Sequence, residues 1–198
     1  EDAYEDPTFH RSRSHDYVAK EVKAVRENLG VSEVASFANH KFTGSGARTF
    51  LDRILAGHMP ERGRVNLSPM LLESGKLNGD LTVACIDDET YYLFGSSVAQ
   101  NMHLRWFEKH LEGVDDVIYK NMTDDFHGIA ISGPNSRELL SRLTREDVSS
   151  DAFKFRDIRD TFIGGVPALC VRLSFTGELG YEIYVAPQYQ LKLFEEIQ

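Results

Sequence analysis

Two carboxylates stand inside segments that otherwise have the composition of β-strands. Asp80 lies within "KLNGDLTVACI", and Glu182 lies within "GYEIYV". Asp is among the poorest strand formers, and burying a charged carboxylate is costly unless it is paired or hydrogen-bonded. Two interpretations are open. Either both side chains lie on solvated strand faces, or both line a pocket and accept hydrogen bonds from the donor nitrogens of a ligand.

The segment around Glu182, "SFTGELGYEIYV", predicts a turn followed by a strand. Gly177 and Gly180 bracket the turn, and alternating apolar residues follow. Successive side chains of a strand point to opposite faces. We therefore expect Glu182 to face away from Tyr181 and Ile183, which leaves the question of the pocket open.

Metal-ligating patterns are weak. His103 and His110 are seven positions apart on a predicted helix, but no H-x-x-x-H or C-x-x-C accompanies them. These histidines are interpreted as solvated or packing residues, and we predict no metal site. Cys85 and Cys170 each lie in an apolar, strand-like segment, which predicts buried thiols in a reducing compartment.

Two catalytic or nucleotide patterns are incomplete. "TGSGAR" contains a G-x-G, but Thr49 occupies the place of the third glycine of a dinucleotide fingerprint, so a tight turn is the better interpretation. No G-x-S-x-G elbow is present. A Ser-His-Asp arrangement is not excluded by counting residues, so a hydrolase stays a weak option.

Composition narrows the class of protein. The chain has 198 residues, 41% of them hydrophobic, and a formal net charge of −9. This charge disfavours nucleic-acid binding, which needs a basic face. No apolar run is long enough for a membrane span, and no signal peptide is recognised. We expect a cytoplasmic protein, or a mitochondrial matrix protein if the source is eukaryotic.

The acidic start without Met and the uncapped helical end suggest a fragment of a longer protein.

Hydrophobic periodicity and turn residues place helices and strands along the whole chain. Helices are expected over residues 12–31, 45–63, 99–111 and 133–143, with a helical pattern at 191–198; strands are expected over 31–44, 64–74, 76–86, 90–97, 116–122 and 126–133, with a hairpin over 161–175. Most connections are short and hairpin-like. The pattern favours an α+β fold with mostly antiparallel sheets and packed helices over alternating βαβ units.

Three of these segments, in order, resemble one known family. "RVNLSPMLLESGKLNGDLTV", "FHGIAISGPNSRELLSRL" and "LSFTGELGYEIYV" are similar to the folate-binding aminomethyltransferase family, which includes the glycine-cleavage T-protein and the C-terminal halves of dimethylglycine and sarcosine dehydrogenases. The resemblance begins near Phe9, and the opening "FHRSRSHDY" is closer to the flavin-dehydrogenase relatives. It implies one folate-binding module over residues 1–198, built from two interleaved α+β subdomains with a division near 44–125 and lacking the family's C-terminal β-barrel.

The resemblance implies tetrahydrofolate as the ligand and gives each carboxylate a role. Glu182 matches the family's pterin-binding Glu, which accepts hydrogen bonds from the amide-like N–H and the exocyclic amine. Asp80 matches the acidic residue near the folate N5 and N10 atoms. It is expected to act as the catalytic residue by positioning and stabilising a cationic iminium, with proton transfer as a further role.

Other positions match the family only in part. Phe175 stands where the T-protein has Tyr, so it can stack but cannot donate a hydroxyl. Ser96 corresponds to a pocket Asn and Phe37 to a Met near the pterin, and Tyr181 beside the Glu completes the expected folate-binding set. Gly79 replaces the first Asp of a doublet. The family's folate-contacting Arg belongs to the barrel and would lie beyond residue 198.

The implied function is tetrahydrofolate-dependent one-carbon transfer. An iminium carbon from an N-methyl amino acid or glycine would be captured as 5,10-methylenetetrahydrofolate. FAD is expected only if a dehydrogenase domain, covalently fused, precedes the fragment; a lipoyl carrier protein is the less favoured partner for a chain of charge −9. The alternatives are a non-catalytic folate-binding or interaction module, for which Asp80 is dispensable, and a demethylase on the same fold.

Overall fold

The computed structural model of the chain describes residues 9–198. Its helices are α1 (His15–Glu27), α2 (Ala47–Ile54), α3 (Gln100–Leu111), α4 (Ser136–Leu143) and α5 (Gln190–Ile197). Its strands are β1 (Gly30–Glu33), β2 (Ala38–Thr43), β3 (Arg64–Leu71), β4 (Leu77–Asp87), β5 (Thr90–Gly95), β6 (Ile118–Asn121), β7 (His127–Ser132), β8 (Ile158–Ile163), β9 (Val166–Val171) and β10 (Gly180–Val185). The four predicted helices contain α1 to α4, and the helical pattern at 191–198 overlaps α5.

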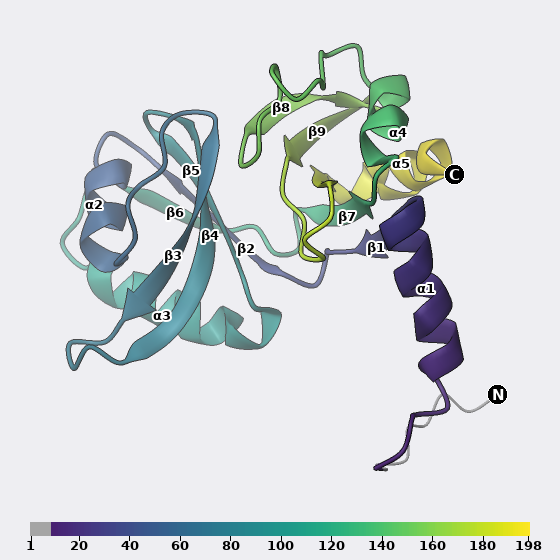
Figure 1. Cartoon of the computed structure of the whole chain (residues 1–198). Helices are drawn as coiled ribbons and strands as arrows, with labels where there is room; N and C mark the ends of the chain where they lie inside the picture. Colours follow the sequence, from purple (N-terminus) through teal and green to yellow (C-terminus); the bar gives the residue numbers. More distant parts are fainter. Residues whose placement is uncertain (1–8) are drawn as a thin grey trace.

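The strands form two five-stranded sheets (Figure 1). One sheet has the order β1-β7-β10-β9-β8 and the other has the order β3-β4-β5-β2-β6, with antiparallel pairing throughout. The predicted α+β class with antiparallel sheets is confirmed. The strand that carries Glu182 is the central strand of the first sheet, and the strand that carries Asp80 lies second from the edge of the other.

The single strand predicted over 31–44 is wrong. Residues 30–33 and 38–43 form two strands that belong to different sheets: Val31 is opposite Ile131 in β7, whereas Phe42 is opposite Tyr91 in β5. The backbone N–H of Ser36 donates to the Glu33 carboxylate at 2.7 Å in the turn between them. Local sequence pattern does not mark the boundary between the two strands, and only their long-range pairing separates them.

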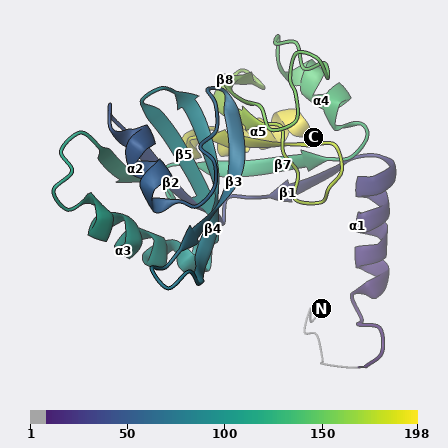
Figure 2. The same ribbon diagram turned by 60° about the vertical axis from the view of Figure 1, so that its left-hand side comes forward.

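Buried apolar residues form three clusters. Figures 1 and 2 show the arrangement of the sheets and helices that these clusters hold together. Helices α2 and α3 pack on the outer face of the β3–β6 sheet, and α4 and α5 pack on the outer face of the other sheet. The third cluster lies between the sheets, and Phe94 and Tyr184 stack across it with ring centroids 4.7 Å apart. This middle cluster brings β10 close to β4 and β5.

Helix α1 differs from the other helices because it buries no residue. It projects from the body of the molecule toward the N-terminus (Figures 1 and 2). Val18 and Val22, which are four positions apart and so lie on one face of the helix, are 46% and 44% exposed. Among the described residues, no helix combines the length and the hydropathy needed to cross a membrane.

The predicted burial of both cysteines is confirmed. Cys85 and Cys170 are free thiols with 1% of their surface exposed. Burial raises the pKa of both thiols, so both stay protonated at neutral pH. Within residues 9–198 the His, Cys, Asp and Glu side chains form no cluster that could hold a metal ion.

Candidate functional site

A cavity of about 890 Å³ opens between the two sheets. Its walls come from β3, β4 and β5 on one side, from β10 on the other, and from loop residues 155–156 and 173–175. Small-molecule sites in proteins commonly have volumes of about 300–1,000 Å³. The cavity is therefore large enough for a planar ligand with a flexible tail.

Five of the six predicted site residues line this cavity, namely Asp80, Glu182, Phe175, Phe37 and Ser96. The two carboxylates come from different sheets and far-apart positions in the sequence. Of the two interpretations that the sequence left open, the structure favours the second, in which both side chains line a pocket.

Tyr181 is the exception. It lies in the cluster between the sheet and helices α4 and α5, is 0% exposed, and stacks on Phe153 at 5.7 Å between ring centroids. The alternation of β10 explains this placement, because Tyr181 and Ile183 face the helices while Glu182 faces the cavity. The expected contact between Tyr181 and the ligand is therefore not supported, and we remove Tyr181 from the site.

Glu182 is half-buried on a central strand whose backbone is paired on both sides. Its Cα partners are Ala130 in β7 and Val171 in β9. The hydroxyl of Tyr184 donates a hydrogen bond to Glu182 Oε2 at 2.8 Å. Burial raises the pKa of Glu182, and the Tyr184 hydrogen bond opposes this effect in part. A ligand that brings further N–H donors into the cavity would therefore stabilise the charged form of this carboxylate.

Tyr184 is a site residue that the sequence prediction did not include. Burial and the Glu182 charge hold its pKa well above 10, so its hydroxyl remains a donor. The ring packs against Phe94, which also lines the cavity. The strand alternation that separates Glu182 from Tyr181 also puts Tyr184 on the face of Glu182, and this signal was available in the sequence.

Aromatic side chains form much of the remaining wall. Phe94 is buried and Phe37 is half-buried, whereas Phe155 and Phe175 are 60% and 91% exposed at the rim. Aromatic side chains in a cavity wall suit a ligand with a flat ring system, because such rings contact one another by stacking.

Asp80 lies on the opposite wall from Glu182, on a stretch of β4 whose backbone is constrained. Its Cα partner is Pro69 on β3. The preceding residue, Gly79, has φ of 138°, and a Cβ there would lie 3.2 Å from Met70 Cε. Both facts account for glycine at position 79. The Asp80 carboxylate is exposed toward the cavity and is free to meet a cationic ligand group.

A buried imidazole pair lies behind Asp80. His103 Nδ1 is 3.4 Å from His40 Nε2, and His40 Nδ1 is 2.9 Å from the hydroxyl of Tyr119. Burial and, to a smaller extent, the neighbouring His103 lower the pKa of His40 to about 3. Burial also lowers the pKa of His103, and the Asp80 charge opposes this effect. The interpretation of His103 as a packing residue is confirmed, but its pairing with His40 was not predicted.

The pair should make the protein less stable in acid. The unfolded chain protonates His40 near its ordinary pKa of 6.5, but the folded protein does so only near 3, so the unfolded state binds more protons as the pH falls between these values. Between pH 7 and pH 5 we expect His40 to cost about 2 kcal/mol of unfolding free energy. Urea unfolding of wild type and His40→Asn at both pH values measures the difference, since the Asn amide does not titrate.

The exposed His58 provides the control for this prediction. His58→Asn should lose as much stability on acidification as the wild type does. Equal losses in wild type and His40→Asn would contradict the buried, neutral state of His40.

Comparisons with known proteins agree with the fold. The family described as GCVT N-terminal domain matches residues 2–198. The mitochondrial dimethylglycine dehydrogenase of Mus musculus is 34% identical over 192 residues, which are 96% of this chain and 22% of the relative. An aminomethyltransferase of Chloroherpeton thalassium is 30% identical over 191 residues, 96% of this chain and 52% of the relative. The chain thus spans about a fifth and about half of these proteins.

Two solved structures share the fold. The glycine cleavage system aminomethyltransferase T from Bartonella henselae superposes with a TM-score of 0.80 at 19% identity, over 91% of this chain and 48% of that chain. A chain of the heterotetrameric sarcosine oxidase from Corynebacterium sp. U-96 superposes with a TM-score of 0.70 at 16% identity, over 96% of this chain and 93% of that chain.

Proposed function

The chain belongs to the GCVT N-terminal domain family, and we propose that it is the folate-binding module of an enzyme that transfers one-carbon units to tetrahydrofolate. One observation carries the proposal. Glu182, a half-buried carboxylate with a raised pKa, faces an aromatic-walled cavity and accepts a single hydrogen bond among the described residues. Burying such a carboxylate costs free energy when its oxygens lack hydrogen-bond partners. A ligand that donates hydrogen bonds to it removes part of this cost.

The hydrogen-bond acceptors and aromatic rings of the cavity suit a reduced pterin. Glu182 would accept hydrogen bonds from the pterin amide N–H and the exocyclic amine, a planar bidentate arrangement. Tyr184 would hold the carboxylate in place through its hydroxyl. Phe37 and Phe175 would stack on or flank the ligand, and Ser96 would offer a hydroxyl at the opposite wall.

Asp80 would stand near the reacting atoms. When bound, tetrahydrofolate supplies the two nitrogens, N5 and N10, between which a one-carbon unit is carried. Asp80 would stabilise positive charge there by its own negative charge and could exchange a proton with a ligand nitrogen. The protein would thereby contribute proximity and electrostatics more than covalent chemistry.

The source of the carbon is a further part of the proposal. The dehydrogenase relatives are named for dimethylglycine and the aminomethyltransferases for their transfer reaction. We favour an amine-derived iminium made by a fused flavin domain that holds FAD outside this segment, since the mouse dehydrogenase is the more similar of the two. A mitochondrial matrix location would follow from that relationship, with the cytoplasm as the alternative.

A non-catalytic folate-binding module is the second candidate. Phe175, almost fully exposed at the rim, has no hydroxyl to hold a ligand. A module of this kind needs Glu182 but not Asp80. A demethylase on the same fold would need both and would differ in the ligand that donates the carbon.

Calorimetric titration with 5-formyltetrahydrofolate tests the proposal. We expect saturable binding of one ligand per chain, and no comparable binding of p-aminobenzoylglutamate, which lacks the pterin. Absence of binding, both in this chain and in a longer chain that includes the C-terminal part present in the aminomethyltransferase relatives, would overturn the folate assignment.

A further inference from the structure

The loop before β8 holds an arginine in an unusual conformation. Arg156 has φ of 67° and is the only non-glycine residue with positive φ among residues 9–198. This region strains any residue that has a Cβ. Strain of this kind persists where the surroundings fix it, and it is frequent at ligand sites.

Backbone hydrogen bonds fix Arg156 between the two sheets. Its N–H donates to the carbonyl of Arg172, which follows β9, at 2.9 Å. Its carbonyl accepts from the N–H of Val65 on β3, also at 2.9 Å. The residue thus links the end of β9 to β3, and its backbone cannot shift without breaking one of these hydrogen bonds.

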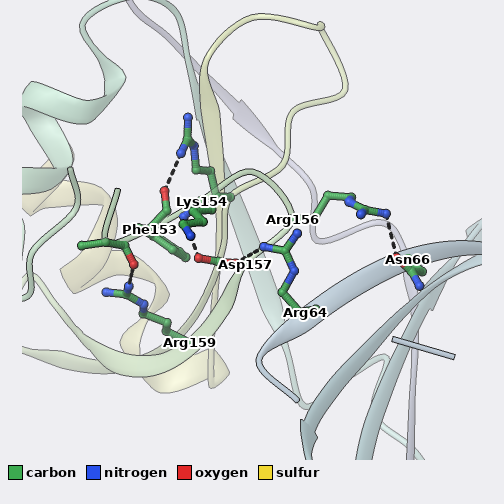
Figure 3. A network of polar contacts seen from close by, with 9 residues as sticks. Arg64, Asn66, Phe153, Lys154, Arg156, Asp157 and Arg159 are labelled. Carbon is green, nitrogen blue, oxygen red and sulfur yellow. Dashed lines mark hydrogen bonds and ion pairs between the residues drawn. The ribbon is translucent and has the colours of Figure 1, made fainter. Parts of the chain in front are cut away.

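A polar network supports the rest of the loop (Figure 3). The carboxylate of Asp157 accepts from the N–H of Lys154 at 2.6 Å and forms an ion pair with Arg64 of β3. Arg159 donates to the carbonyl of Ala152. These contacts hold the loop on both sides of Arg156, so the backbone that carries its guanidinium is fixed in position.

The guanidinium of Arg156 donates a hydrogen bond to an uncharged side chain. Arg156 Nη1 donates to Asn66 Oδ1 at 2.7 Å (Figure 3). Asn66 Nδ2 donates in turn to the carbonyl of His58 at 3.0 Å, which orients the Asn66 amide. Arg156, Asn66 and His58 all line the cavity. No ion pair of the described residues neutralises Arg156, so its charge and its remaining N–H donors are available to a ligand.

We propose that Arg156, oriented by Asn66, is a subsite for a carboxylate of the cavity ligand. The inference rests on the proposed function and extends it: the donor-rich pterin end of a reduced folate meets Glu182, and the dicarboxylate tail at the other end meets Arg156. A guanidinium recognises a carboxylate through paired N–H···O bonds that a neutral group cannot replace. The subsite therefore selects folates with an anionic tail.

The test compares 5-formyltetrahydrofolate with its diamide, in which both glutamyl carboxylates are neutral amides of nearly the same size. We expect wild type to bind the acid about tenfold more tightly than the diamide. Arg156→Gly should lose this preference and bind the diamide as the wild type does. Arg62→Ala, which removes an exposed charge outside the cavity lining, should keep the preference.

Thermal unfolding separates binding from folding. Glycine adopts φ of 67° without strain, so Arg156→Gly should unfold at the wild-type temperature or above it. A stable Arg156→Gly variant that keeps the preference for the acid would overturn the inference alone. Failure of the wild type to bind either ligand, both in this chain and in the longer chain described above, would overturn the proposed function and the inference together.

Discussion

Replacing Glu182 with alanine should weaken the binding of 5-formyltetrahydrofolate by about 100-fold, because two hydrogen bonds to a charged carboxylate are lost together. The free energy of unfolding should decrease much less than the free energy of binding. Burial raises the pKa of Glu182, which means that the folded protein disfavours its charged form at neutral pH. The affinity change is measured by titration calorimetry and the stability change by urea unfolding.

Two further variants make this result specific. Glu182→Gln keeps an acceptor for the Tyr184 hydroxyl but removes the charge, and it should show most of the loss in affinity. Glu178→Ala removes a carboxylate from the turn before β10 that does not line the cavity, and it should bind as the wild type does. If Glu178→Ala and Glu182→Ala lost affinity equally, the turn rather than the carboxylate would be responsible.

Replacing Asp80 with asparagine should slow one-carbon transfer by about 100-fold or more while folate affinity changes by less than about threefold. The amide has nearly the same size as the carboxylate, but it carries no charge and does not accept a proton. The rate of 5,10-methylenetetrahydrofolate formation measures the first effect, and calorimetry measures the affinity.

Asp88→Asn is the matched control, because Asp88 is exposed at the β4–β5 turn and lies outside the cavity lining. It should leave both rate and affinity unchanged. A wild-type transfer rate in Asp80→Asn would favour the non-catalytic folate-binding module over the transferase.

The local part of the site was predictable from the sequence. The two-residue period of β10 correctly separates Glu182 from Ile183, because a central strand has one face toward the helices and the other toward the second sheet. The same period places Tyr181 in the helix-facing core, although the family resemblance had put it beside the ligand.

The long-range part of the site was not predictable from local patterns. Nothing in the alternation of β4 or β10 says that Asp80 and Glu182 line one cavity, which depends on how the two sheets pack. Arg156 was missed because its signal is a backbone conformation imposed by Val65 and Arg172, which neighbouring residues do not encode. The His40 and His103 pair was missed for the same reason, since it joins a strand and a helix.

The contact between Glu182 and the pterin is tested by a double-mutant cycle. Wild type and Glu182→Ala are each titrated with 5-formyltetrahydrofolate and with its 2-desamino-2-methyl analogue, which lacks the exocyclic amine. We expect a coupling free energy of about 1.5 kcal/mol between the side chain and the amine, because each is the hydrogen-bond partner of the other. A coupling near zero, with both ligands still bound by the wild type, would show that Glu182 does not hold the pterin amine.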